Sequence, residues 1–203
     1  DLLNYPAFLQ FILRVAASSE SVSLMAPPQA VGDVAYKDSA AIKDECTRLR
    51  RHVDSLAQKP AGAFMTAPSP GIIATAMENK HYANLGDYVD ALGKALAVEY
   101  RTIVESGFTL QIDAPDLAMD RTMFHRDLSD AQFVTAIEKQ VDAINRAIAG
   151  IPADRVRLHV CYGNWEGPHV YDVPLATILP ALYQARVGAL SIVTADRDET
   201  ARV

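Results

Sequence analysis

The chain alternates between two patterns of hydrophobic residues. Short, nearly continuous apolar runs such as GALSIV are typical of parallel strands that are buried on both faces. Longer segments carry apolar residues at spacings of three and four, which indicates amphipathic helices. The short runs predict strands at 30–36, 63–66, 108–113, 156–161 and 189–194. The longer segments predict helices at 40–56, 85–104, 130–148 and 175–184.

Residues at the expected helix starts support these limits. Ser39 and Ser129 stand directly before two of the predicted helices, where a side-chain oxygen can accept a hydrogen bond from the first turn. Ser69, Pro70 and Gly71 follow the second predicted strand, and they predict a turn into a short helix because proline is favoured at the first helical position. Such a helix start could also hold an anion, but a plain turn is the simpler interpretation.

The predicted elements follow the order βαβαβα, which indicates an α/β fold with a parallel sheet. An open doubly wound sheet and a closed barrel both fit this order. The chain has no GxGxxG or GxxxxGK[ST] motif, which a nucleotide-binding sheet would need. Polar residues end several predicted strands, namely Thr66, Asp113 and the pair His159 and Cys161. Barrel enzymes gather their functional groups in this way, so we expect a (β/α)8 TIM barrel.

The number of predicted units is too small for a whole barrel. About five β/α units are visible, whereas a complete barrel has eight and takes about 250 residues. The chain also opens on Asp1 rather than on Met. We therefore expect one partial TIM-barrel domain over residues 1–203, with strands missing at both ends.

Composition and charge exclude several classes of partner. Of the 203 residues, 50% are hydrophobic and 22% are charged, which suits one compact domain. The net charge is −6 and the basic run at 48–52 is short, so neither nucleic acid nor an anionic membrane is an expected partner. The apolar run at 5–12 is interrupted by Pro6 and Gln10 and is shorter than the roughly 20 residues of a membrane span.

Cysteine usage predicts the compartment. Cys46 and Cys161 are the only cysteines, too few for a disulfide framework in a domain of this size. The chain also lacks a basic stretch followed by an apolar core and a small-residue cleavage site, the pattern of a secretory signal. We therefore expect a soluble protein in the reducing cytoplasm.

The strongest chemical signal is the sequence RLHVCYGNWEGP at 157–168. Side chains two positions apart in a strand leave the same face, so His159 and Cys161 point at one spot. Imidazole and thiolate are preferred zinc ligands, which makes a metal site one interpretation. The alternative is two ordinary buried side chains, because cysteine is among the most buried residue types.

Four runs carry a family resemblance: FMTAPSPGIIA, GFTLQIDAPDLAMDR, RVRLHVCYGNWEGPHVYDVPL and GALSIV. They resemble the barrel of the cobalamin-independent methionine synthase family, in its short single-barrel branch, which is related to epoxyalkane:coenzyme M transferase. The resemblance runs from about Tyr5 to Ala195. It implies a zinc-dependent thiol methyl- or alkyltransferase like 5-methyltetrahydropteroyltriglutamate-homocysteine methyltransferase, with a small-molecule thiol substrate and a methyl or alkyl donor.

The resemblance also implies roles for individual residues. His159 and Cys161 match two zinc ligands of the family, and Asp113 matches the acidic residue that holds the amino group of the thiol amino acid. Two further family ligands are missing, because Val193 stands where a Glu is expected and no aligned second Cys precedes Val203. Glu166 or His169 could replace a missing ligand, and the residues that could line the site are Thr66, Asn164, Glu166 and His169.

Three alternatives stay open at this stage. Asp113 could simply cap the helix after its strand. The barrel could be metal-free like the related porphyrinogen decarboxylases, although the strand ends are poor in the arginines that those enzymes use. The chain could also be an inactive barrel fragment or paralogue with a packing or partner-binding role. His52, His81 and His125 have no ligand-spaced partner and are expected to be surface or packing residues.

Overall fold

A four-stranded parallel sheet forms the centre of the computed structural model, which describes residues 5–18, 27–163 and 171–192. The strands lie in the order β2-β4-β5-β6, so each one pairs with the next of the four along the chain. Sequential parallel pairing of this kind is how a barrel wall is built, and the predicted parallel α/β architecture is confirmed. The bounds are β2 (Phe64–Pro68), β4 (Thr109–Asp113), β5 (Val156–Val160) and β6 (Ala189–Ile192).

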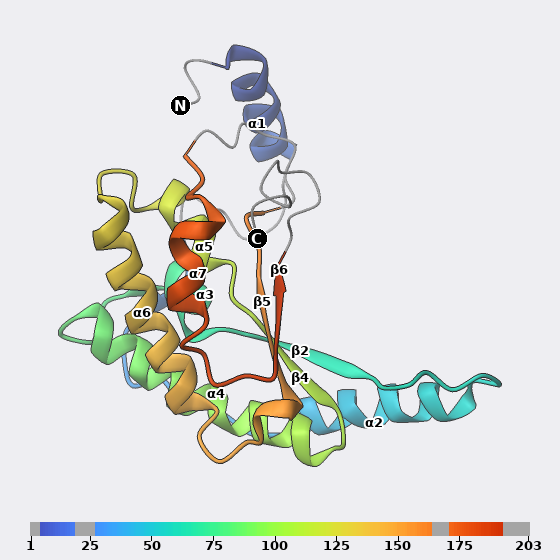
Figure 1. Ribbon diagram of the computed structural model, residues 1–203. Helices are drawn as coiled ribbons and strands as arrows, with labels where there is room; N and C mark the ends of the chain where they lie inside the picture. The colour runs from blue at the N-terminus through green and yellow to red at the C-terminus, as the bar shows by residue number, and fades with distance from the viewer. Residues whose placement is uncertain (1–4, 19–26, 164–170, 193–203) are drawn as a thin grey trace.

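Helices connect the strands and cover one side of the sheet. Figure 1 shows α3, α6 and α7 stacked beside the strands, while the helix α1 (blue) lies apart from the sheet. A short 3-10 turn at Ala153–Arg155 leads into β5. The helices are α1 (Pro6–Ser18), α2 (Ala40–Ser55), α3 (Pro70–Ala76), α4 (Leu85–Glu105), α5 (Asp116–Met123), α6 (Asp130–Ala147) and α7 (Leu175–Leu182).

The two faces of the sheet differ in burial. On β4, Leu110 and Ile112 are fully buried, and on β5 the same is true of Leu158. These residues pack against the helices, in a core that also holds Tyr100, Phe108, Phe133 and Ile144. The alternate positions of the same strands are only half-buried. Because paired residues of parallel strands share a face, the sheet has a helix face and a more open face, and the open face is the one that lines the interior of a barrel.

Two of the predicted helix starts have the expected side-chain cap. Ser129 and Gln132 form a capping box at the start of α6, and the Ser69 side chain accepts a hydrogen bond from the Ile72 N–H at the start of α3. Pro70 occupies the first helical position of α3, where its missing N–H costs nothing. The expected turn into a short helix is therefore correct. Ser39 does stand at the N-cap of α2, but its side chain makes no capping hydrogen bond, and the Ala40 N–H donates to Asp38 Oδ1 over 2.8 Å instead.

The first predicted strand is wrong beyond its first residue. Only Gln29–Ala30 forms a strand, β1, and it pairs with β3 (Glu78–Asn79) in a separate two-stranded sheet. Gly32 and Asp33 interrupt the apolar run, and Val31 is 76% exposed. The Val34 N–H then donates to the Tyr82 hydroxyl instead of a neighbouring strand. Local apolar character without a pairing partner does not make a strand.

Two helices were not expected from the sequence. The run at 5–12 belongs to α1, in which Pro6 takes the first helical position and therefore does not interrupt the helix. The short α5 follows directly after β4 and Pro115. None of the helices in the described ranges is long and apolar enough to cross a membrane.

Candidate functional site

The register of the sheet brings the predicted site residues together. Asp113, the last residue of β4, pairs with His159 on β5, and the Ala114 N–H donates to the His159 carbonyl over 2.8 Å. Both side chains lie on the open face, at the carboxyl end of the sheet. Thr66 lies on the same face but lower, because it pairs with Gln111, two residues before Asp113. The structure therefore gathers Asp113 and His159 at one edge and places Thr66 beneath them.

His159 has the orientation expected of a metal ligand held by the backbone. Its Nδ1 lies 3.0 Å from the carbonyl oxygen of Ser191, its partner on β6. A carbonyl oxygen can only accept, so this hydrogen bond requires the proton on Nδ1 and leaves the lone pair on Nε2. Metal-binding histidines usually make such a bond with the other ring nitrogen.

Cys161 follows β5 and continues the half-buried positions of His159. Its thiol is free, and the Gly163 N–H donates a hydrogen bond to its Sγ over 3.2 Å. This turn needs a glycine, because Gly163 has φ +86°, a conformation that other residues rarely adopt. A backbone donor at the sulfur is compatible with a thiolate ligand.

Asp113 is held by a side chain of its own strand. Gln111 Nε2 donates to Asp113 Oδ1 over 2.8 Å, and Arg157 Nε donates to Gln111 Oε1 over 2.7 Å. The capping alternative for Asp113 is not what the structure has, because α5 begins after Pro115 and has no side-chain cap. The carboxylate instead stands at the end of β4 beside His159.

The implied zinc ion can be tested against these donors. His159 and Cys161 are of a suitable residue type, and the Nδ1 bond of His159 leaves its Nε2 for a metal, yet a zinc site that admits substrate uses three protein ligands. In the part of the chain that the structure describes, no group of three or more His, Cys, Asp or Glu side chains could hold a metal. Four residues of the sequence argument lie outside the described ranges: Asn164, Glu166, His169 and Val193. The described donors thus fit two zinc ligands and no more.

Sequence reasoning missed a buried acidic group directly behind the site. Asp116 in the first turn of α5 is 3% exposed, and burial raises its pKa from the usual 3.8 to about 7, against the lowering effect of a hydrogen bond from Ser69. Asp120, one helical turn later, has its pKa raised by burial to about 6. The signal was present in PDLAMD, where two acids four residues apart share a helix face with apolar neighbours.

The three other histidines in the described ranges are found where we expect them. His52 is exposed, and His81 contacts Asp33 at the surface over 2.9 Å. His125 lies 6.1 Å from the Phe133 ring, and burial followed by the charge of Arg121 lowers its pKa. Their environments are those of surface and packing residues.

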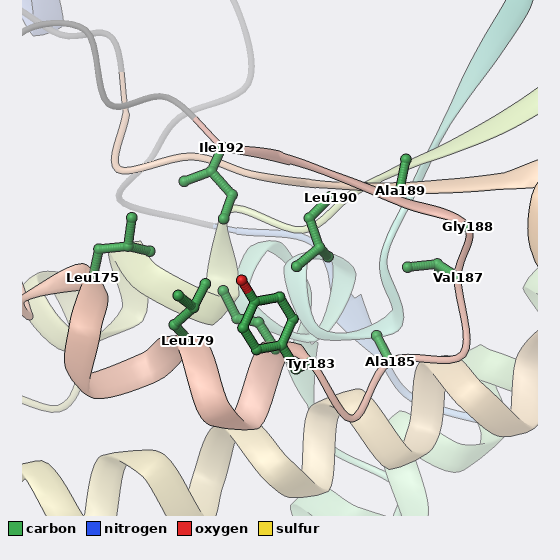
Figure 2. Close-up of a pocket in the computed structure, with 10 residues that line it drawn as sticks. Leu175, Leu179, Tyr183, Ala185, Val187, Gly188, Ala189, Leu190 and Ile192 are labelled. Carbon is green, nitrogen blue, oxygen red and sulfur yellow. The ribbon is translucent and has the colours of Figure 1, made fainter. Parts of the chain in front are cut away.

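A hollow of about 520 Å³ lies elsewhere, between α7 and β6. Figure 2 shows Leu190 and Ile192 of β6 pointing toward Leu175 and Leu179 of α7 across it. The lining is apolar and contains none of the predicted site residues. The hollow lies at the outer strand of the sheet, where a closed barrel carries its next helix. We therefore interpret it as a gap in the helix layer and not as a substrate site.

Comparison with known proteins agrees with this geometry. The chain is 30% identical over 160 residues to a methionine synthase of Saccharolobus solfataricus. The aligned region covers 76% of this chain and 42% of the relative. Methionine synthases of Saccharolobus islandicus are 33% identical over 102 residues. The chain thus spans less than half the length of these curated relatives. No family model matches it.

A solved structure shares the fold. A B12-independent methionine synthase from Shewanella sp. W3-18-1, in complex with selenomethionine, superposes with a TM-score of 0.51 at 20% identity, over 66% of this chain and 34% of that one. The class of protein is therefore a parallel α/β protein that forms part of a TIM barrel. The resemblance to the cobalamin-independent methionine synthase family is confirmed by the sequence relatives and the fold together.

Proposed function

We propose that this protein is a zinc-dependent transferase that moves a methyl or alkyl group onto the sulfur of a small thiol, as in methionine synthesis from homocysteine. The observation that supports the proposal is the pairing of His159 with Asp113 at the carboxyl edge of the sheet, with Cys161 two residues after His159. Barrel enzymes carry their chemistry at this edge. The names of the sequence relatives support the same reaction class.

Each residue has a role that follows from its chemistry. Zinc, when bound, would hold the substrate thiol in its thiolate form. His159 would bind zinc through Nε2, because its Nδ1 donates to Ser191. Cys161 would bind through Sγ. Asp113 would hold the ammonium group of a thiol amino acid by a charge-assisted hydrogen bond, and the selenomethionine bound to the structural neighbour supports an amino-acid site in this fold.

The reaction balances without an oxidant or a reductant. The substrate sulfur gives up its proton and forms a bond to the methyl or alkyl carbon. The bond between that carbon and the donor breaks, and the donor keeps the electron pair. Both participants are small molecules. Two free cysteines, Cys46 and Cys161, suit the reducing cytoplasm as the place where this would happen.

Metal content tests the proposal. We expect the purified full-length protein to contain about one zinc per chain, and His159→Ala combined with Cys161→Ala to lose it, because two ligands are removed. His52→Ala is the matched control, since this exposed histidine lies outside the site and its loss should leave the zinc in place. Equal zinc content in the double variant and in the unchanged protein would refute the metal site.

One other function has an observation in its favour. Val193 stands where the family has a ligating Glu, so the protein could be an inactive paralogue with a packing or partner-binding role. In that case the unchanged full-length protein would hold no zinc, and it would not alkylate homocysteine when a methyl donor is supplied. Product mass is the measurement that separates the two functions.

A further inference from the structure

Three side chains form a continuous hydrogen-bonded line across the open face of the sheet. Arg157 on β5 pairs with Gln111 on β4 and donates from Nε to Gln111 Oε1 over 2.7 Å. Gln111 in turn donates from Nε2 to Asp113 Oδ1 over 2.8 Å. The guanidinium also lies over the Phe64 ring of β2 at 4.1 Å, so the Arg157 side chain contacts both β4 and β2.

The chemistry of the three groups sets the direction of the line. A guanidinium has only donors, so it orients the Gln111 amide with its oxygen toward Arg157. The amide nitrogen then faces Asp113, whose ionised carboxylate can only accept. Without Arg157, the amide would lose the bond on its oxygen, and the Gln111 side chain could take other rotamers that no longer hold Asp113 Oδ1 in place. Among the described residues, Gln111 is the only hydrogen-bond partner of that carboxylate.

We propose that Arg157 and Gln111 are positioning residues, which fix the Asp113 carboxylate by its Oδ1 and leave Oδ2 directed at the ammonium group of the substrate. This inference rests on the proposed function, because it takes Asp113 as the group that binds the ammonium. The inference also explains substrate preference. The hydrogen bonds from Arg157 through Gln111 to Asp113 would let the protein distinguish an amino acid from the same molecule without its amino group.

Ligand binding to the full-length protein tests the line directly. Methionine and its desamino analogue are suitable probes, because they differ only in the amino group and neither has a thiol that must reach a metal. Calorimetric titration gives a Kd for each, and the ratio of the two is the preference for the amino group. We expect Arg157→Met and Gln111→Met each to lower this preference about tenfold, the usual effect of losing a hydrogen bond to a charged group.

Conservative and control variants separate positioning from folding. Arg157→Lys should keep most of the preference, because a lysine can still donate to Gln111 Oε1. Arg155→Met is the matched control: Arg155 precedes the same strand and donates to the Phe108 carbonyl over 3.0 Å, away from Asp113. Its loss should leave the preference unchanged. The inference would be overturned if Arg157→Met raised the Kd of both probes by the same factor, or if it left the ratio of the two Kd values unchanged.

Asp113→Asn distinguishes this failure from failure of the proposed function. We expect Asp113→Asn to remove the preference, and Arg157→Met to change it no further in that background. If Asp113→Asn removes the preference but Arg157→Met does not lower it, the line is refuted while the role of Asp113 stands. If Asp113→Asn leaves the preference intact, the proposed role of Asp113 is refuted, and so is the positioning role of Arg157 and Gln111. The metal site is tested separately by the zinc content.

Discussion

The hydroxyl of Ser69 donates a hydrogen bond to Asp116 Oδ1 over 2.5 Å, and both residues are buried. The same serine donates its backbone N–H to the Asp113 carbonyl over 2.9 Å and accepts from the Ile72 N–H. One residue thus joins the end of β4 to the starts of α3 and α5. The buried carboxylate of Asp116 is therefore part of the support beneath the candidate site.

Asp116 makes stability depend on pH. Burial raises its pKa from 3.8 to about 7, so the folded state binds this proton more tightly than the unfolded state does. Protonated Asp116 therefore adds to the free energy of unfolding at low pH, and this addition is lost as pH rises from about 4 to about 7. Asp116→Asn has no proton to lose, so above pH 7 we expect it to be more stable than the unchanged protein by roughly 2–4 kcal/mol. Urea unfolding of the full-length protein at a series of pH values measures the difference.

The surroundings of Asp116 give a second reason for this expectation. Asp116 Oδ2 and Gln140 Oε1 are both buried without a hydrogen-bond partner. An Asn side chain replaces Oδ2 with an N–H₂ donor near Gln140 Oε1 and keeps an oxygen that accepts from Ser69. Asp142→Asn on the exposed side of α6 serves as the control and should change nothing across the same pH range. A stability difference for Asp116→Asn that does not grow between pH 4 and pH 8 would contradict the assigned shift.

Gly71 in α3 must remain a glycine for the same group to fit. A Cβ at this position would lie 2.8 Å from Asp116 Cγ, closer than side-chain atoms pack, and 2.9 Å from Gln140 Oε1. We expect Gly71→Ala to lower the free energy of unfolding by about 1–3 kcal/mol. Gly62→Ala, where nothing lies within 4 Å, should have little effect. A Gly71→Ala midpoint in urea equal to that of Gly62→Ala would show that the carboxylate is not packed against the helix.

Much of the fold was predictable because local patterns and pairing agree. The strands around Leu110 and Leu158 are short apolar runs between turn residues, and the helices around Tyr100 and Ile144 have regular apolar spacing. The pairing of His159 with Asp113 follows from the register of β5 against β4, whereas Cys161 lies just after β5 and its role with His159 stays a prediction. The family resemblance supplied Asp113, which a pattern of residue types cannot distinguish from a helix cap.

The remaining features depend on contacts that are far apart in the sequence. Val31 lies in an apolar run but has no strand beside it, so it is exposed. Asp116 is buried only because α3 and α6 pack around it, and its partner Ser69 is 47 positions away. The line from Arg157 to Asp113 needs the register of β4 against β5. No short stretch of sequence contains this information, because each contact joins segments that meet only after folding.

Thr66 offers a test of the site that does not disturb the fold. Its side chain is exposed on the open face of β2, and no hydrogen bond to another described residue holds it. We expect Thr66→Val to change the free energy of unfolding by less than about 0.5 kcal/mol, as surface substitutions do. If Thr66 lines the substrate site, the KM for the thiol should change while stability does not. Unchanged steady-state kinetics would remove Thr66 from the candidate site.

Leu158 and His159 are neighbours on β5 that point to opposite faces, and this orientation decides whether the site can exist. Leu158 is fully buried against the helices, so Leu158→Ala should lower the free energy of unfolding by about 2–5 kcal/mol. His159 is half-buried and its side chain makes one hydrogen bond to the described residues, to Ser191 O, so His159→Ala should cost only about 1 kcal/mol. Urea titration of both full-length variants gives the comparison. Should His159→Ala cost as much as Leu158→Ala, the imidazole would be a core residue, and it could not reach a metal and a substrate at the open edge of the sheet.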